Sequence, residues 1–286
     1  MPLGAPGPPV WSVRLRLDIA YDGTDFSGWA AQPGRRTVAG VLGEALARLF
    51  GPDGASGLTA AGRTDAGVHA TGQVCHVDVP ATAWEALAGS LVRRLAGLLP
   101  DDARVLDVRP VPDTFDARFS ALSRRYAYRV TDAPHGADPL RRHDTLAWPR
   151  TLDRTALAAA AALLVGEHDF AAFCKRKEHA TTLRTVHRLD WRRDPVDGVL
   201  VATVEADAFC QAMVRSLVGA LLAVGDGRRP VGWPAELLTR RGRASEVGVV
   251  PAHGLTLVAV AYPADPAEYA VRAERTRRRR DASATG

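Results

Sequence analysis

Apolar and polar residues alternate strictly where the folded part of the chain begins. Val13, Leu15, Leu17 and Ile19 are separated by charged residues, and this period of two over seven residues predicts a strand with one buried face. Comparable runs, bounded by turn-forming residues, predict further strands. They lie just before residue 60 and at 73–79, 103–111, 123–130, 182–191, 198–207 and 255–262.

A helical period marks four other segments. After Thr37, a favourable N-cap residue, apolar residues recur at positions 38, 41, 42, 45, 46 and 49 and predict a helix. The same periodicity predicts helices at 83–99, 152–165 and 209–225, of which the last is long and strongly apolar.

The order of these elements predicts the fold class. Strands follow one another as hairpins, which is typical of an α+β protein and not of a doubly wound parallel sheet. We expect two similar halves, residues 12–114 and 119–263, each a mainly antiparallel sheet with helices on one face (ferredoxin/RRM-like). A cleft between the halves is the natural place for a site. Residues 1–11 and 264–286 are expected to be flexible tails.

Composition narrows the class of protein. Of 286 residues 47% are hydrophobic and 24% are charged, as in a globular protein and unlike a disordered one. No apolar run approaches the roughly 18 residues of a membrane span, and the start lacks a secretory signal, so we expect a cytoplasmic protein. Cys75, Cys174 and Cys210 are odd in number and far apart, which predicts reduced thiols.

The charge favours a polyanionic partner without requiring one. The formal net charge is +5, and 35 of the 37 basic residues are arginines. Arginine binds phosphate bidentately and stacks on bases, which lysine does not do. The excess is modest, so it indicates a partner class and not an activity.

Residues 60–72, AAGRTDAGVHATG, form the most distinctive segment. Its glycines permit tight turns and the close approach of a ligand. Arg63 and Asp65 are two positions apart, so in an extended stretch their side chains face the same side. The arginine can then keep the carboxylate ionised or bind a phosphate beside it. Taken alone, the segment is better explained as a turn with a capping aspartate and a surface arginine.

The string GRTDAGVHA resembles the signature of the TruA family of tRNA pseudouridine synthases. Five further segments resemble that family, in the right order and over nearly the whole folded chain, which is far more specific than one motif. These segments are YDGTDFSGW, FDARFSALSRRYAYRV, GEHDFAAF, FCQAMVRSLVGAL and PAHGLTLVAVAYP.

The resemblance implies an isomerase that converts uridine to pseudouridine at positions 38, 39 and 40 of the tRNA anticodon stem-loop. It implies that Asp65 is the catalytic residue and acts on a flipped-out uridine. The carboxylate would either attack C1′ or help to abstract a proton during glycosidic cleavage. The resemblance implies no metal and no cofactor, and it implies a homodimer that binds tRNA.

Three more residues acquire roles from the resemblance. Tyr126 corresponds to a base-stacking tyrosine, Arg215 to an arginine that pairs with Asp65 or a phosphate, and Arg63 to a residue that positions Asp65. Simpler explanations remain open, namely a core tyrosine on a strand and an arginine that reaches the surface. Gln211, Arg215 and Gly219 recur at helical spacing, so we expect this stripe to line the cleft.

Other polar residues carry weaker expectations. His69 is expected to be structural or an RNA contact. Some of the clustered basic residues should contact the tRNA backbone, although a solvated surface explains any single one better. The cluster comprises Arg124, Arg125, Arg141, Arg142, Lys175, Arg176, Lys177, Arg192 and Arg193.

The chain departs from the family pattern at three positions. Ala30 and Ala39 stand where glutamine is common, and Asp116 stands where histidine is common. These departures bear on RNA contacts and not on the catalytic residues. We also expect that removal of residues 266–286, which are rich in arginine, lowers tRNA affinity at low salt and leaves turnover at saturating tRNA unchanged.

Two other functions remain open. An RNA-binding or tRNA-folding module without catalysis would use the same basic cleft, although the presence of Asp65 with Arg63 argues against it. A metal enzyme would use His168, Cys174 and His179, but their spacing matches no compact ligand pattern.

Overall fold

The computed structural model describes residues 12–175 and 181–282, with side chains up to residue 278. The strands are β1 (Ser12–Tyr21), β2 (Ser56–Ala60), β3 (His69–Pro80), β4 (Ala103–Val111), β5 (Ser123–Thr131), β6 (Leu146–Ala147), β7 (Gly166–Asp169), β8 (Leu183–Arg193), β9 (Leu200–Ala206) and β10 (Leu255–Ala261). The helices are α1 (Val38–Phe50), α2 (Ala81–Leu87), α3 (Leu91–Leu98), α4 (Arg154–Ala162), α5 (Met213–Gly225), α6 (Trp233–Leu237) and α7 (Glu268–Ala282), with short 3-10 turns η1 (Pro139–Arg141), η2 (Ala171–Phe173) and η3 (Ala252–Gly254).

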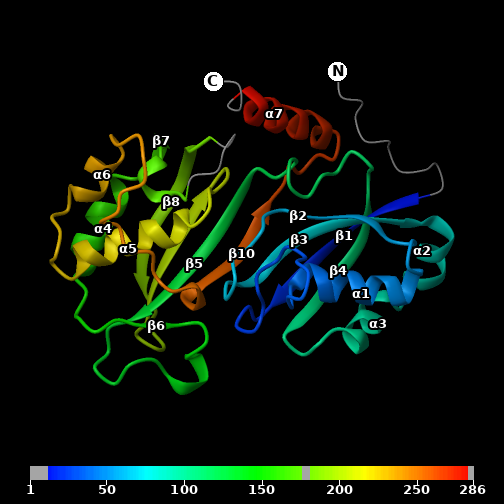
Figure 1. Ribbon diagram of the computed structural model, residues 1–286, viewed down its shortest axis with the longest axis horizontal. Coiled ribbons are helices and arrows are strands. Elements are labelled where there is room, and N and C mark those ends of the chain that lie inside the picture. The colour runs from blue at the N-terminus through cyan, green and yellow to red at the C-terminus, as the bar shows by residue number, and fades with distance from the viewer. Residues whose placement is uncertain (1–11, 176–180, 283–286) are drawn as a thin grey trace.

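The strands form one continuous sheet in the order β4-β1-β3-β10-β5-β9-β8-β7, with β2 on β3 and β6 on β5 (Figure 1). The β3–β10 and β5–β6 pairs are parallel, and the other pairs are antiparallel. This confirms the predicted α+β class with a mainly antiparallel sheet. The last strand, β10, pairs with both β3 and β5, so it joins the sheets of the two halves at the centre.

Helices α1, α3, α4 and α5 share one hydrophobic core with the sheet. In β1 the core-facing residues are Leu15, Leu17 and Ile19, each at most 2% exposed, as the alternating pattern predicts. The N-cap of α1 is the predicted one, because the Thr37 side chain accepts a hydrogen bond from the backbone N–H of Gly40.

Three predicted helices have different bounds in the structure, and the one predicted at 152–165 is shortened to Arg154–Ala162. Residues 83–99 divide into α2 and α3, and the break falls at Gly89 and Ser90, residues with low helix propensity. The predicted helix at 209–225 begins only at Met213, because Ala212 has a left-handed backbone with φ of 64°. The four residues before Met213 therefore form a loop that leads into α5.

The opposite face of the sheet carries a second, smaller core. Val74 faces it while the next residue, Cys75, faces the helices. Phe115 and Ala117 cover this face, and the ring of Tyr269 from α7 packs edge-on against Phe115 with centroids 5.1 Å apart. Residues 264–286 are thus not a flexible tail throughout. They include α7, which lies across the junction of the halves (Figure 1), because an apolar partner far away in sequence holds it there.

The expectation of three reduced cysteines is wrong for two of them. Cys174 and Cys210 form a disulfide with Cα atoms 5.7 Å apart. The bond joins the end of η2 to the loop before α5, two segments that are 36 residues apart in sequence and that only the tertiary fold brings together. Cys75 is free and buried, and burial raises the pKa of its thiol.

His76 should make stability depend on pH. It is buried, accepts a hydrogen bond of 3.0 Å at Nδ1 from the backbone N–H of Ala117, and has a pKa lowered to about 4 by burial and by the charge of Arg14. The folded protein keeps this imidazole neutral while the unfolded chain takes up a proton below pH ~6.5. We expect the free energy of unfolding to fall by about 3 kcal/mol through this group between pH 6.5 and 4.

Urea unfolding of the wild type and of His76→Asn at several pH values measures this contribution. Asparagine can still accept the hydrogen bond from Ala117 but does not titrate in this range. The other titrating groups are common to both proteins, so the difference between the two curves isolates His76. Parallel curves from pH 6.5 to 4 would exclude this role for His76.

Candidate active site

The loop that contains Asp65 connects β2 to β3 and is held in place by the first loop of the chain. The backbone N–H of Trp29 donates to the carbonyl of Thr64 over 3.1 Å, and the N–H of Gly67 donates to Phe26 over 3.3 Å. The Tyr21 hydroxyl lies 2.8 Å from the hydroxyl of Thr64. Residues before and after Asp65 are therefore held in place, Thr64 by Trp29 and Tyr21 and Gly67 by Phe26.

Two glycines allow the two loops to approach this closely. A Cβ atom on Gly28, whose φ is +94°, would lie 2.8 Å from the carbonyl oxygen of Thr64. A Cβ atom on Gly23 would lie 2.1 Å from the carbonyl oxygen of Val68. The segment YDGTDFSGW thus has a physical function, which is to support the loop of Asp65 through backbone contacts that only glycine permits.

Asp65 faces Arg215, which lies in the first turn of α5. One terminal nitrogen of Arg215 is 3.8 Å from Oδ2 of Asp65, and the two side chains are 21% and 38% exposed. The Nε atom of Arg215 donates to the carbonyl of Val250 over 2.7 Å. Arg215 is thus anchored at one edge and presents its other edge to the carboxylate, while Asp65 remains accessible to a ligand.

The expected stripe of Gln211, Arg215 and Gly219 does not form one face of α5, because the helix begins only at Met213 and because Gly219 is covered. A Cβ atom at Gly219 would lie 1.9 Å from the carbonyl oxygen of Gly248, so this glycine is covered by the backbone that precedes Val250. The small residue serves close packing of α5 against residues 248–250. That packing places the Val250 carbonyl where Arg215 binds it.

Tyr126 lies on β5 next to this pair. It is 8% exposed, and its ring meets the ring of Phe209 edge-on with centroids 5.2 Å apart. Burial raises the pKa of Tyr126, and Tyr21 and Asp65 raise it further, so the phenol is neutral at ordinary pH. The structure places Tyr126 in the core beside Asp65, as its simpler explanation had it.

Arg63 takes no part in this packed arrangement. It is exposed and makes no hydrogen bond or ion pair with the residues that the structure describes. The structure thus brings Asp65, Arg215 and Tyr126 together and leaves Arg63 exposed, without a contact to any of the three.

A family model described as tRNA pseudouridine synthase matches residues 19–120 and 160–263. The chain belongs to the tRNA pseudouridine synthase family. Pseudouridine synthases are isomerases, so this is an enzyme family. Asp65 and Arg215 lie within the matched ranges, and Tyr126 lies between them.

Individual members of the family are similar over almost their whole length. The protein named tRNA pseudouridine synthase A from Frankia casuarinae is 63% identical over 265 residues, which cover 93% of this chain and 94% of that protein. Its namesake from Mycobacterium leprae is 54% identical over 277 residues, with coverage of 93% and 94%. The one from Corynebacterium glutamicum is 52% identical over 261 residues, with coverage of 88% and 90%.

His69 is a structural residue in this member of the pseudouridine synthase family. It is 6% exposed, its Nδ1 accepts from the N–H of Gly23 over 2.9 Å, and its Nε2 lies 2.7 Å and 3.0 Å from the carbonyls of His143 and His253. These contacts tie β3 to the first loop and to two segments of the second half.

Several side chains around the site were not foreseen from the sequence. The hydroxyl of Tyr21 contacts the hydroxyl of Thr64, and the side-chain amide of Gln73 donates to the carbonyl of Gly62. The ring of Phe209 packs against the ring of Tyr126. Tyr21 and Phe209 belong to segments that resemble the pseudouridine synthase family, but nothing in their local pattern shows what they contact. The contacts arise from pairings between distant strands and loops.

The residues of the predicted basic cluster have different surroundings in the structure. Arg124 is 8% exposed and donates to the carbonyls of Ala61, Arg118 and Asp207, so it is a structural residue. Surface ion pairs hold four others, each with a neighbouring carboxylate: Arg125, Arg141, Arg192 and Arg193. Arg142 donates to the carbonyl of Pro139, Lys175 is exposed, and Arg176 and Lys177 lie outside the described residues.

The three departures from the family pattern have different surroundings. Asp116 accepts hydrogen bonds from the N–H groups of Arg118 and Phe119, and it forms an ion pair of 2.8 Å with Arg277 of α7. Ala39 packs against the core from α1. Ala30 is half-buried in the first loop.

The metal-enzyme alternative receives no support. Within residues 12–175 and 181–282, no three histidine, cysteine or acidic side chains are placed to hold a metal ion. Cys174 is in the disulfide, the Nε2 atom of His168 lies 3.1 Å from the Val165 carbonyl, and His179 falls outside the described residues. In the part of the chain that the structure describes, no helix is long and apolar enough to cross a membrane.

Proposed function

We propose that this protein converts uridine to pseudouridine at positions 38, 39 and 40 of the tRNA anticodon stem-loop, with Asp65 as the catalytic residue. The observation that carries the proposal is the contact between Asp65 and Arg215, 3.8 Å apart and held by separate anchors. Both residues belong to segments in which the chain resembles its family, and they are 150 positions apart in sequence.

The reaction breaks the bond between N1 and C1′ of uridine and forms a bond between C5 and C1′. The proton on C5 leaves, and N1 gains a proton, so atoms and electrons balance without an oxidant or reductant. In this proposal Asp65 acts as a carboxylate. It either bonds to C1′ or accepts a proton while the glycosidic bond breaks.

Arg215 places a permanent positive charge beside the negative charges of the reaction, namely the carboxylate and the departing uracil. The target atoms are stacked within the RNA, so the nucleotide is flipped into the site. In this proposal Tyr126 stacks on the flipped base, a contact worth about 1–3 kcal/mol, and Phe209 moves away from its ring. Arg63 binds a phosphate near Asp65 and helps to position the loop.

The proposal includes a homodimer that acts on tRNA in the cytoplasm and uses no metal and no small-molecule cofactor. Modification at three neighbouring positions is consistent with recognition of the shape of the RNA, and not of its base sequence.

Position mapping tests the proposal. Unmodified tRNA transcripts that carry uridine at position 38, 39 or 40 are incubated with the protein, and pseudouridine is located by carbodiimide adducts that stop reverse transcription. Stops at these positions, and none in transcripts with cytidine there, are expected. Stops elsewhere would contradict the positions, and tRNA binding without any stop would favour an RNA-binding module without catalysis.

A further inference from the structure

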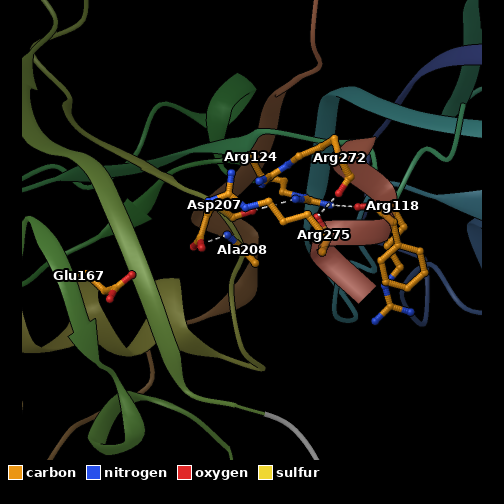
Figure 2. A pocket seen from close by; sticks show the side chains of 9 residues that line it. Arg118, Arg124, Glu167, Asp207, Ala208, Arg272 and Arg275 are labelled. Carbon is orange, nitrogen blue, oxygen red and sulfur yellow. Dashed lines mark hydrogen bonds between the residues drawn. The ribbon is translucent and has the colours of Figure 1, made fainter. Parts of the chain in front are cut away.

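A cavity of about 560 Å³ lies between α7 and the first residues of β5, and four of its nine lining residues are arginines (Figure 2). We call it the arginine pocket and define it by Arg118, Arg124, Arg272, Arg275 and Thr276. Two of these arginines come from the body of the protein at the junction of its halves, and two come from α7. The cavity is therefore built jointly by segments that are about 150 residues apart in sequence.

The charge of the pocket is positive. Four arginines line it against two carboxylates, Glu167 and Asp207. Oδ1 of Asp207 accepts hydrogen bonds from the backbone N–H groups of Thr185 and Ala208, which hold this carboxylate against the loop beside β9. A phosphodiester suits such a site, because arginine donates two parallel hydrogen bonds to phosphate oxygens.

The pocket is built around a rigid centre and not on surface side chains alone. Arg124 is 8% exposed, and its guanidinium donates to the backbone carbonyls of Ala61, Arg118 and Asp207. All three acceptors are neutral backbone carbonyls, so none of them cancels the positive charge of the guanidinium.

The same arginine connects the pocket to the active site. Ala61, which accepts from Arg124 over 2.9 Å, is four residues before Asp65. Four residues span at most about 14 Å even when fully extended. A chain of nucleotides that enters the active site is thus close enough to continue across the pocket.

Helix α7 is fixed in place by contacts outside the pocket. Ala273 is 2% exposed, and Ser120 donates through its hydroxyl to the carbonyl of Tyr269 over 3.1 Å. Arg277 pairs with Asp116, one of the positions where the chain departs from its family. This docking turns Arg275 and Thr276 toward the cavity, and Arg275 makes no hydrogen bond or ion pair with any residue in the described ranges.

We propose that the arginine pocket binds the sugar-phosphate backbone of the RNA substrate and that Arg275 of α7 is a phosphate ligand there. The proposal rests on the proposed function, because the RNA that reaches the pocket is the one whose uridine enters the site of Asp65. In this proposal Asp116 has a structural role, because its ion pair with Arg277 holds α7 beside the pocket.

Deletion of α7 would not test this proposal, because it would uncover Phe115 and the small core beneath it. The sharper comparison is Arg275→Gln with Arg278→Gln in the full chain. Arg278 lies on the same helix, does not line the pocket and pairs with Glu274. Both substitutions remove one positive charge from an exposed position of α7, and equal unfolding midpoints would show that neither disturbs the fold.

Affinity for unmodified tRNA is measured over a range of salt concentrations. We expect Arg275→Gln to raise the Kd roughly tenfold at about 50 mM salt and to reduce the slope of log Kd against log salt by about 0.8, as loss of one phosphate contact does. Arg278→Gln should keep the Kd within about twofold of the wild-type value.

The outcomes separate this proposal from the proposed function. Equal effects of the two substitutions, or no effect of Arg275→Gln on affinity and slope, would overturn the proposal that the pocket binds RNA. Pseudouridine formation by the wild type would not be affected by that result. Selective loss of affinity in Arg275→Gln, together with a wild type that forms no pseudouridine, would support the pocket and overturn the proposed catalysis.

Discussion

Replacement of Asp65 by asparagine should abolish pseudouridine formation and leave tRNA binding almost unchanged. The amide has the same shape as the carboxylate but is neither a nucleophile nor a base. We expect the single-turnover rate to fall by more than about 10³-fold, as when a group that forms or breaks bonds is removed. Nucleoside chromatography of digested tRNA measures the rate, and filter binding measures the Kd.

Asp25→Asn is the matched control for this substitution. Asp25 is an exposed aspartate in the first loop, and it lies outside the contacts between Asp65 and Arg215. Its replacement should change neither rate nor affinity by more than about twofold, as usual for exposed positions. If Asp65→Asn retained a rate similar to that of Asp25→Asn, Asp65 would not be the catalytic residue.

The second large effect is expected at Arg215. Arg215→Met keeps an apolar side chain of similar length on α5 but removes the charge 3.8 Å from Asp65 and the donor to the Val250 carbonyl. Loss of one electrostatic contact to the reacting groups costs about 10²–10³-fold in rate. We expect a fall of that size in kcat for Arg215→Met, with little change in KM.

Arg215→Lys separates charge from geometry at this position. Lysine keeps the positive charge but lacks the planar fork that binds Val250 and faces Asp65 at the same time. Its kcat should lie between those of the wild type and Arg215→Met. A normal kcat with a raised KM in Arg215→Met would instead show that Arg215 only binds RNA. Thermal unfolding of each variant controls for loss of structure.

Local features of the fold were predictable because the residues concerned carry their own signal. The alternation from Val13 to Ile19 predicts β1 and its buried face, and Thr37 predicts the start of α1. These features depend on neighbours in sequence, through the period of two and through one capping hydrogen bond.

Features that depend on distant partners were not predictable in the same way. The helix in residues 268–282 is strongly charged and becomes ordered where Tyr269 meets Phe115, which is more than 150 positions away. The disulfide between Cys174 and Cys210 likewise needs two loops that the fold brings together. The pairing of β10 with β3, which joins the halves, has no local signature either.

The candidate site shows the same division. Nothing in local sequence relates Asp65 to Arg215, and only the resemblance of their segments to one family suggested that they meet. The structure adds the anchors that sequence could not supply, namely Thr64 on Tyr21 and Arg215 on Val250.

Release of tritium from tRNA that carries [5-³H]uridine tests the central claim most directly, because the new bond to C1′ replaces the hydrogen on C5. The wild type and Asp65→Asn are assayed side by side, with tRNA binding measured on the same samples. Release by the wild type alone, with binding by both proteins, is the predicted result. Binding without release by the wild type would contradict the claim that this protein is a pseudouridine synthase, and equal release by both would contradict the role of Asp65.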